Sequence, residues 1–553
     1  MTKPHTSARN RILAFVRDYG PILAILGLAT GLRLDGIGFG LPALNDPDEP
    51  LFMMLSFGML DRGSLDPQWF GHPGTITLYS LALVMVGVAG AGIAGGQFAG
   101  IEDFAQAVYL DPGLVILPSR WFIAANGIAC VWLTYLIGRR LWGRDSGLAA
   151  ALFLAVNAVH VSWSQVIRTD VQASVFMLAC LLATIGYFHE GGRRALILAG
   201  IFAGLACATK WPAAIVLASP LAVAAWRWRR ARGGWRDMIL LSLAAGLALL
   251  AVSPFLLISY DTVLSDLAGE ARGSHPGATG SGLAGNLAAY LAGPLALSFG
   301  RIGLALALAG VLAASIRSRG HRLVVLPVLA AFMLLIALQS LWWERWLVPV
   351  LPLFALSLGW LLRHAMRSLR RHHAGASGCA VTALALVLAL PMMIESRVRA
   401  AERAQDTRQA ASQWIRRHAA PGATVLVEHA AIDLLQGPWP VKFPLGAAGC
   451  IDARAVLAGR ISASEVDERR EASAVVDLGH VDPAMMDSCA ADFYVLSNFQ
   501  RYEAERSEFP GAYAQYLAIV RANPIVAKFA PVPGCQGGPT VLIVAARGSA
   551  PTD

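Results

Sequence analysis

Met238–Leu257 reads MILLSLAAGLALLAVSPFLL, a run without a single charged side chain. The apolar core of a bilayer, about 30 Å thick, is crossed by about 20 apolar residues in a helix, so this run predicts a membrane-spanning helix. Similar runs occur at Ile302–Ala314, Leu323–Leu338, Leu347–Leu362 and Cys379–Met393. Because a soluble protein has no reason to contain so many, the sequence predicts an integral membrane protein.

The composition of the whole chain agrees with this prediction. Of its 553 residues, 56% are hydrophobic and 15% are charged, whereas a soluble domain has about 25% charged residues. The 45 Lys and Arg exceed the 36 Asp and Glu, a bias that can signal nucleic-acid binding. Many of these basic residues stand in short clusters between the apolar runs, as in cytoplasmic loops of membrane proteins. We therefore expect the lipid bilayer as a partner and no nucleic acid.

The basic clusters also give the helices an orientation. With the clusters and the basic segment Met1–Arg17 in the cytoplasm, the chain forms about eleven spans and has an external C-terminus. No small-residue cleavage site follows the first apolar run, so we interpret that run as an uncleaved anchor. The clusters are Arg139–Arg144, His189–Arg194, Trp226–Arg236, Arg317–Arg322 and Arg363–His373.

This orientation leaves five connections on the outer face. They are residues 41–118, the turn at Arg168–Asp170, the turn at Lys210, residues 260–290 and Trp342–Trp346. Within the first connection, Gly74–Phe98 is apolar enough to cross, yet both its neighbours must be external. Because this segment is rich in Gly and Ala, we expect a re-entrant or interfacial helix there.

From about Glu395 the composition becomes that of a soluble domain. A helical pattern is followed by short runs that are typical of strands, which together favour an α/β layer structure. The helix is expected at Asp406–His418 and the strands at Thr424–Val427, Phe493–Leu496 and Val541–Ala545. We therefore predict a transmembrane domain over residues 1–394 and an external α/β domain over residues 395–553.

Three cysteines lie in this C-terminal region: Cys450, Cys489 and Cys535. Three thiols permit at most one disulfide and leave one over, and their spacing does not say which pair forms. The sequence contains no CxxC pair, so a structural zinc site is not expected.

The first external connection opens with Asn45-Asp46-Pro47-Asp48-Glu49-Pro50, just after the first span. Three carboxylates so close together raise one another's pKa, so one of them can act as a base near neutral pH. The alternative is a solvated acidic loop without a chemical role. Further along, Trp69, Phe70 and His72-Pro73 are typical either of an interfacial aromatic belt or of a surface that stacks on a sugar ring.

Ionisable residues also stand at the outer ends of other spans, where a charge is usually paired or functional. Arg168 and Asp170 share one turn, and they either pair with each other or bind an anionic ligand. Lys210 either reaches the lipid headgroups or binds the same ligand. Arg345 suits bidentate phosphate recognition, although the adjacent Glu344 can neutralise it.

The loop at residues 260–290 adds a further polar group, with Glu270, Arg272, His275 and Asn286. Acids and cations on one membrane face suit a lipid-phosphate substrate, whose polyprenyl tail stays in the bilayer while cations hold the phosphate. A carboxylate then deprotonates a hydroxyl that attacks the anomeric carbon of the sugar. The sequence has no glycine-rich phosphate loop, which fits a reaction without a nucleotide.

Six motifs occur in an order that resembles a known family. They are Pro47-Asp48-Glu49-Pro50, Gly71-His72-Pro73-Gly74, Arg139–Gly143, Ile167–Val171, Ala208–Trp211 and Glu344–Pro352. Over residues 10–365 the chain resembles the C-type integral-membrane glycosyltransferases, in the branch of protein O-mannosyltransferases and lipid A aminoarabinose transferases (family 39-like). Trp346 stands where the family has Tyr, which affects the expected placement of the neighbouring Arg345.

This resemblance implies a helical bundle with interfacial helices in the first external loop. It implies that Asp48 is the catalytic base, with Glu49 beside it, and that Asp170 is a second catalytic acid. It also implies that Lys210 and Arg345 lie near the carrier phosphate. From their positions in the chain, we expect four further substrate-binding residues: Asp46, His72, Arg168 and His275.

The resemblance implies a polyprenyl-phosphate sugar as donor, but the sequence names neither the sugar nor the acceptor, which is a protein, lipid or glycan hydroxyl. Related oligosaccharyltransferases use a divalent metal and the mannosyltransferases do not, so the acids leave metal dependence open and no cofactor is assigned. The Ala-, Arg- and Gly-rich composition is typical of bacteria with GC-rich genomes. We therefore expect an inner-membrane enzyme with a periplasmic site.

Two other functions would use the same residues. A transporter or lipid flippase usually places charges near the bilayer midplane and has internal repeats, whereas here the charges lie at one face and no repeat is found. A non-catalytic receptor or polysaccharide-assembly subunit would act through its C-terminal domain. The sequence favours the transferase because Asp48 and Arg345 are both present.

Overall fold

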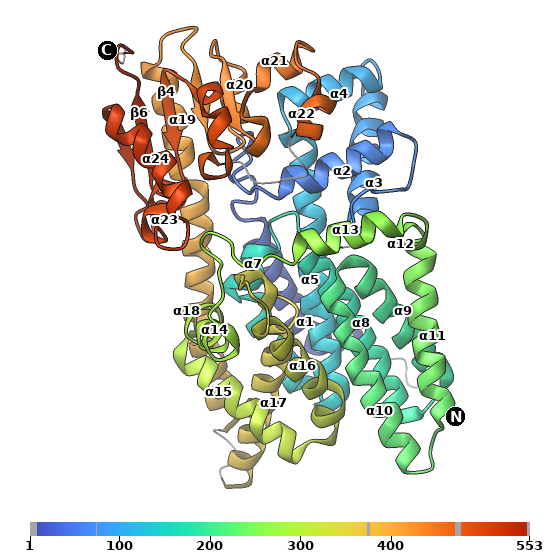
Figure 1. The fold of residues 1–553 in the computed structure, drawn as a ribbon. Coiled ribbons are helices and arrows are strands. Elements are labelled where there is room, and N and C mark those ends of the chain that lie inside the picture. Colours follow the sequence, from blue (N-terminus) through green and yellow to red (C-terminus); the bar gives the residue numbers. More distant parts are fainter. Residues whose placement is uncertain (1–7, 73, 373–376, 470–476, 550–553) are drawn as a thin grey trace.

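The computed structural model of the chain describes residues 8–72, 74–372, 377–469 and 477–549. Figure 1 shows a bundle of helices that carries a smaller domain of helices and strands at one end. The strands of the chain, β1 to β6, belong to this smaller domain. The predicted fold class, a helical polytopic membrane protein with a C-terminal α/β domain, is confirmed.

The helices of the bundle are mostly apolar and are joined by short turns. The first ten are α1 (Ala8–Leu34), α2 (Glu49–Asp61), α3 (Thr75–Ala94), α4 (Ile101–Leu110), α5 (Gly113–Trp142), α6 (Arg144–Ala155), α7 (Ala158–Trp163), α8 (Thr169–Glu190), α9 (Arg193–Thr209) and η1 (Trp211–Leu217). The others include α10 (Ala218–Arg229), α11 (Trp235–Val252), α12 (Phe255–Ile258), α13 (Tyr260–Glu270), α14 (Gly282–Tyr290), α15 (Ala296–Arg317), α16 (Leu326–Ala337), η4 (Glu344–Leu347), α17 (Leu351–His372) and α18 (Ser377–Ala404).

Within the described residues, 7 helices are long and apolar enough to cross a bilayer. They are Phe15–Leu34, Thr75–Ala94, Gly113–Trp142, Thr169–Glu190, Trp235–Val252, Gly282–Arg317 and Ala380–Ala404. Other bundle helices are shorter because the chain interrupts them. For example, α6 ends at Ala155 before α7 begins, and the 17-residue α9 ends at the junction with Lys210. The number of about eleven spans therefore stays a prediction.

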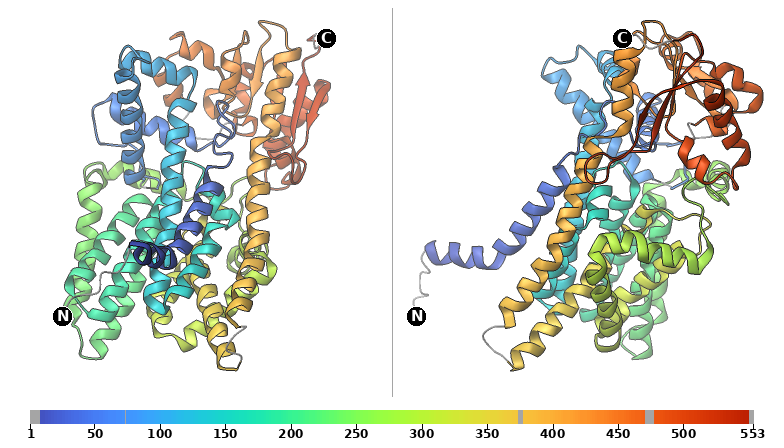
Figure 2. Two further views of the ribbon diagram at one scale, coloured as in Figure 1. Left: turned by 180° about the vertical axis from the view of Figure 1, so that it is seen from behind. Right: turned by 90° about the vertical axis from the view of Figure 1, so that its left-hand side faces the viewer.

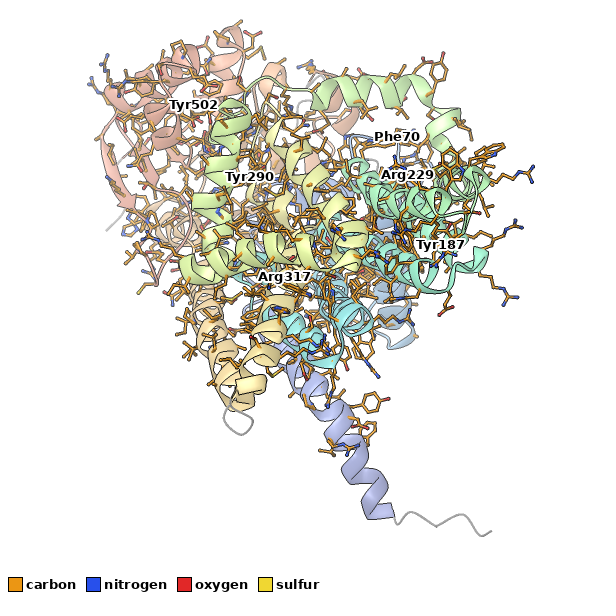
Figure 3. The ribbon with its side chains drawn as sticks, turned by 90° about the horizontal axis from the view of Figure 1, so that it is seen from below. Phe70, Tyr187, Arg229, Tyr290, Arg317 and Tyr502 are labelled. Atoms are coloured by element: carbon orange, nitrogen blue, oxygen red, sulfur yellow. A yellow bond between two sulfur atoms is a disulfide. The ribbon has the colours of Figure 1, made fainter. Side chains whose placement is uncertain are left out.

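The two ends of the bundle carry different loops. The turns that precede α8, follow α9 and precede α17 lie at the end that carries the C-terminal domain, whereas the loop between α10 and α11 lies at the opposite end (Figure 1). Figure 3 looks at that opposite end and labels Arg229 and Arg317, the last residues of α10 and α15. The connections predicted to be external thus share one end of the bundle, and the basic clusters share the other.

The apolar segment that did not fit the predicted spans forms α3. Although α3 is long enough to cross a bilayer, Figure 1 shows it beside α2 and α4, above the level of α9 and α11. The Thr77 hydroxyl in its first turn donates a hydrogen bond to the Gln172 side chain, 2.7 Å away, in the first turn of α8. The start of α3 therefore lies beside the start of α8. Whether α3 is interfacial or re-entrant, as expected from the sequence, stays a prediction.

The C-terminal domain contains one six-stranded sheet in the order β3-β2-β1-β4-β6-β5. Strand β1 is parallel to β2 and β4, and the other pairs are antiparallel. Two strands, β4 (Phe493–Leu496) and β6 (Val541–Ala545), have the predicted bounds, and β1 (Val425–Val427) begins one residue later than expected. The others are β2 (Val441–Pro444), β3 (Cys450–Asp452) and β5 (Ile525–Phe529).

Helices cover both faces of this sheet because its buried side chains alternate. Val425 and Val427 pack with Ile415 of α19 (Thr407–His418) on one face, whereas Leu426 packs with Tyr516 of α24 (Pro510–Ala522) on the other. The remaining helices of the domain are α20 (Ile432–Leu435), α21 (Ala453–Leu457), α22 (Ala463–Arg469) and α23 (Phe499–Ala504).

One disulfide forms in the C-terminal domain, between Cys450 of β3 and Cys489. Cys535 is free and exposed. This agrees with the limit of one disulfide and supplies the pairing that spacing could not. Disulfides persist in oxidising compartments, so this one favours an external location of the domain.

The exposed thiol of Cys535 provides a test of that location. In spheroplasts of an expressing bacterium, a membrane-impermeant maleimide should label the wild-type chain at Cys535, because this thiol is exposed. The other cysteines are not expected to react: Cys450 and Cys489 form the disulfide, Cys130 and Cys180 are buried, and Cys207 is partly buried in the apolar helix α9. The matched Cys535→Ser variant should remain unlabelled. Labelling that occurs only after the membrane is lysed would place the C-terminal domain in the cytoplasm.

Candidate active site

The acidic segment at residues 45–50 turns the chain from α1 into α2. The Asp46 carboxylate accepts a hydrogen bond of 3.0 Å from the backbone N–H of Asp48, which is the N-cap residue of α2. Pro50 follows in the first turn, where a missing N–H does no harm. Carboxylates are favoured at this end of a helix by the helix dipole. These local features set the directions in which Asp46, Asp48 and Glu49 point.

Glu49 points into the protein, where it forms a bidentate ion pair with Arg120 of α5. The Nε and Nη2 atoms of Arg120 lie 2.8 and 2.6 Å from the two carboxylate oxygens, and both side chains are fully buried. Arg120 also donates to the backbone oxygens of Ile37 and Phe39, each at 2.8 Å. Glu49 accepts a further bond of 3.0 Å from the backbone N–H of Ile167. Glu49 is therefore fully engaged in holding α1, α2, α5 and the start of α8 together.

Asp46 and Asp48 point the other way, toward Arg168. Nη2 of Arg168 lies 2.9 and 3.2 Å from the two Asp46 carboxylate oxygens. Its Nη1 contacts the carboxylate of Asp48. Arg168 has extended backbone angles immediately before α8, so its side chain reaches back to the acidic segment. The alternative that Arg168 pairs with Asp170 in the same turn is wrong.

Asp170 instead pairs with Lys210. The Lys210 ammonium donates to the Asp170 carboxylate, and both side chains are almost fully buried. Lys210 adopts an extended conformation between α9 and η1, which directs its side chain inward. Lys210 therefore does not reach for the lipid headgroups, and the prediction that it belongs to the polar site agrees with its position.

The loop that contains His72 lies beside Lys210 because its backbone accepts hydrogen bonds from Trp211, the residue that follows Lys210. The backbone N–H of Trp211 donates to the His72 carbonyl oxygen at 2.7 Å, and its indole N–H donates to that of Phe70 at 3.0 Å. The His72 ring packs between Phe52 and Trp69, with centroids 5.8 and 5.1 Å away. Burial, and then the charges of Lys210 and Arg345, lower the pKa of His72 to about 3, so its imidazole is neutral.

Arg345 completes the cluster from the short helix η4. One of its terminal nitrogens lies 3.9 Å from the Asp48 carboxylate, and its guanidinium lies over the Trp343 ring, 4.7 Å from the centroid. Its Nε is buried without a hydrogen-bond partner among the described residues. Glu344 does not neutralise it, since both Glu344 oxygens pair with Arg399 at 2.9 Å. Arg345 is thus the least firmly held cation of the site.

The four carboxylates of the cluster differ in their exposure to solvent. The side chain of Asp48 is 33% exposed, whereas those of Asp46, Asp170 and Glu49 are 14%, 2% and 0% exposed. An incoming hydroxyl must come within hydrogen-bond reach of the group that takes its proton. Asp48 is the acid of this cluster that meets this condition best.

Two predicted residues are not placed in this cluster. His275 packs against the Trp343 ring, with the two centroids 5.1 Å apart, and the guanidinium of Arg345 lies over the same Trp343 ring. Asn286 is buried and donates to the backbone oxygens of Ala337 and Gln339, which is a structural role. Pro73 lies outside the described residues.

Sequence reasoning missed two cations that organise the site, Arg120 and Arg399. Arg120 stands within an apolar run of α5, and a charge inside a span is usually paired or functional. The charge of Arg120 could be noticed in the sequence, but its ion-pair partner, Glu49, could not be identified there. Arg399 lies in α18, at the predicted domain boundary, where its basic character looked like that of a soluble segment.

Among the described residues, no three His, Cys, Asp or Glu side chains come together as ligands for a metal. Each acid of the cluster contacts a cation instead: Asp46 and Asp48 contact Arg168, Glu49 contacts Arg120, and Asp170 contacts Lys210.

Comparison with known proteins places this site in a known fold. Residues 113–258 match the family model described as dolichyl-phosphate-mannose-protein mannosyltransferase. Apo ArnT from Cupriavidus metallidurans is similar with a TM-score of 0.57 and 15% identity, over 97% of this chain and 100% of that one. ArnT bound to undecaprenyl phosphate gives 0.52 and 15%, over 99% and 100%.

The Archaeoglobus fulgidus oligosaccharyltransferase tethered to an acceptor peptide has a TM-score of 0.50 and 13% identity, over 94% of this chain and 74% of that one. No curated protein matches the chain in sequence. The family model and these structures confirm the predicted resemblance: the chain has the fold of the C-type integral-membrane glycosyltransferases.

The buried Glu49–Arg120 pair predicts a large effect on stability. Arg120→Met leaves the Glu49 carboxylate buried and unpaired, which should destabilise the protein by about 3–5 kcal/mol. The measurement is the thermal midpoint of the purified protein in detergent. Arg62→Met, which changes the exposed C-cap residue of α2, is the matched control and should leave the midpoint unchanged.

The double variant Glu49→Met/Arg120→Met should recover part of the lost stability, because it buries no unpaired charge. A wild-type midpoint for Arg120→Met would show that Glu49 is not held by this pair and would return it to the candidates for catalysis.

Proposed function

We propose that this chain, which has the fold of the C-type glycosyltransferases, transfers a sugar from a polyprenyl-phosphate donor to an acceptor hydroxyl on the outer face of the membrane. The observation that carries the proposal is the position of Asp48. This partly exposed carboxylate stands between two cations, Arg168 and Arg345, at the outer ends of the helices. A base beside an anion-binding surface is what transfer from a lipid phosphate requires.

The reaction follows from this arrangement. Asp48 takes the proton of the acceptor hydroxyl while the hydroxyl oxygen forms a bond to the anomeric carbon of the sugar. The bond between that carbon and the phosphate oxygen breaks, and its electron pair leaves with the polyprenyl phosphate. A base in hydrogen-bond reach of the hydroxyl contributes about 10²–10⁴-fold to the rate of such a step.

Cations stabilise the leaving phosphate, on which negative charge develops. Arg345 is suited to this task because its contact with Asp48 is long, at 3.9 Å, and its Nε has no partner among the described residues. Arg168 also has a buried Nε without a described partner. When the phosphate takes up these donors, the hold of both cations on Asp48 weakens, and the carboxylate becomes free to act as a base.

The other predicted site residues receive supporting roles in this proposal. Asp170 is almost fully buried, so we assign it to holding Lys210 at the phosphate rather than to proton transfer. Asp46 orients Arg168. His72 is neutral and contributes a hydrogen-bonding ring nitrogen beside Lys210. Glu49 was expected to be catalytic; because it is fully engaged with Arg120, we assign it a structural role in this proposal.

The location of the reaction follows from the domain beside the site. The C-terminal domain lies at the same end of the bundle as Asp48 (Figure 1) and contains the disulfide between Cys450 and Cys489. This disulfide supports a site in an oxidising compartment, which for a bacterial chain is the periplasm. ArnT, whose fold is similar, binds undecaprenyl phosphate in one of its structures, and this supports a polyprenyl phosphate as the carrier here.

The test is the release of sugar from a panel of radiolabelled polyprenyl-phosphate sugars by purified protein in detergent. With the correct donor, the wild-type protein should release sugar to water or to an added membrane extract. Asp48→Asn should reduce the rate by about 10²–10⁴-fold, because the amide cannot accept the proton. Binding of the donor should be retained.

Asp61→Asn is the matched control for this change, because Asp61 ends the same helix and points to solvent. It should keep the wild-type rate. If the wild-type protein moves the labelled lipid across vesicle membranes without releasing sugar from any donor, the chain is a flippase and the transferase proposal fails.

A further inference from the structure

The environment of Glu344 contains a contact that the proposed reaction does not use. Glu344 immediately precedes Arg345 in η4, and its carboxylate accepts a hydrogen bond of 3.0 Å from the Trp163 indole N–H. The Trp163 ring in turn lies near Arg168, whose guanidinium carbon is 5.8 Å from the ring centroid. Glu344 is therefore next to Arg345 in the chain and is connected to Arg168 through the Trp163 ring.

A second, bidentate partner compensates this charge. Nη1 and Nη2 of Arg399, in α18, lie 2.9 Å from the two Glu344 oxygens. The pair is partly buried, with the two side chains 23% and 26% exposed, so water screens it only in part. Planar guanidinium and carboxylate groups in this geometry hold each other in a defined orientation. Glu344 is thus turned toward α18 and does not pair with Arg345.

We infer that Arg399 is a positioning residue: it holds the Glu344 carboxylate away from Arg345 and so keeps the Arg345 guanidinium available for the phosphate of the lipid donor. This inference rests on the proposed function, because it concerns the same phosphate. Without Arg399, the Glu344 carboxylate keeps the charge of Arg403, one turn further along α18, and its neighbour in the chain is Arg345. Arg403 is already engaged with the backbone oxygen of Ser162. A Glu344 carboxylate that turns to Arg345 competes directly with the phosphate.

The helix that carries Arg399 is well fixed, as a positioning element must be. Figure 2 shows α18 running along the bundle and into the C-terminal domain. One turn beyond Arg399, Arg403 donates to the backbone oxygen of Ser162 at 3.1 Å. Glu402 accepts from the backbone N–H groups of Gly534, at 2.6 Å, and Gly537, at 2.8 Å, both in the C-terminal domain. Arg399 is therefore held from two sides.

The test measures the affinity of the purified full-length protein for undecaprenyl phosphate alone, without a sugar, a hydroxyl acceptor or turnover. Arg399→Gln should weaken binding on the order of tenfold, the size expected for one uncompensated charge beside a partly screened phosphate site. The double variant Glu344→Gln/Arg399→Gln should restore wild-type affinity, because it removes the competing carboxylate. The single variant Glu344→Gln should bind undecaprenyl phosphate at least as well as the wild type, because it also removes the competing carboxylate. If the Glu344–Arg399 pair were merely structural, Glu344→Gln would bind more weakly.

Arg397→Gln is the matched control, since Arg397 lies two residues earlier in α18 and pairs with Asp35 at 3.0 Å, away from η4. It should bind like the wild type. Wild-type affinity of Arg399→Gln, or a loss that Glu344→Gln does not reverse, would overturn the inference. The proposed function fails separately, if the wild-type protein itself does not bind undecaprenyl phosphate.

Discussion

A carboxylate buried in the interior of a membrane protein must be paired, and the bidentate contact between Glu49 and Arg120 meets this constraint for the whole outer end of the bundle. Desolvation makes such a pair costly unless the remaining hydrogen-bonding groups are also satisfied. Here the backbone oxygens of Ile37 and Phe39 and the backbone N–H of Ile167 satisfy them. Because Glu49 is adjacent to Asp48, and Ile167 to Arg168, one buried pair fixes both partners of the central contact of the site.

The C-terminal domain and the helix α18 that leads into it also contact the segments around the site. Its Arg408 donates to the backbone oxygen of Asn45 at 2.6 Å, at the start of the acidic segment, while α18 reaches η4 through Arg399. The domain is therefore attached to both sequence segments that flank Asp48. We therefore regard the domain as a structural part of the site, because it helps to hold the segments on which Asp48 and Arg345 lie.

Much of this architecture could be predicted because it depends on local chemistry. Apolar runs, basic loops and the strands around Phe493 and Val541 follow from periodicity and composition. The site residues could be grouped because their turns all fall on one face of the membrane. The pairing could not be predicted, since charges far apart in the chain meet only in the folded bundle: Asp170 meets Lys210 and Glu344 meets Arg399. The pairing of Glu49 could not be foreseen for the same reason, because its partner Arg120 lies in another helix.

The central claim is that the lipid phosphate binds at the outer ends of the helices, between Asp48 and the cations around it. A cryo-electron microscopy structure of the protein with bound undecaprenyl phosphate tests this most directly. The account predicts the phosphate in contact with Arg345 and beside Arg168 or Lys210, with the Asp48 carboxylate released toward the open side of the site. A phosphate at the bilayer midplane or at the basic end of the bundle, with Asp48 still paired to Arg168, would contradict it.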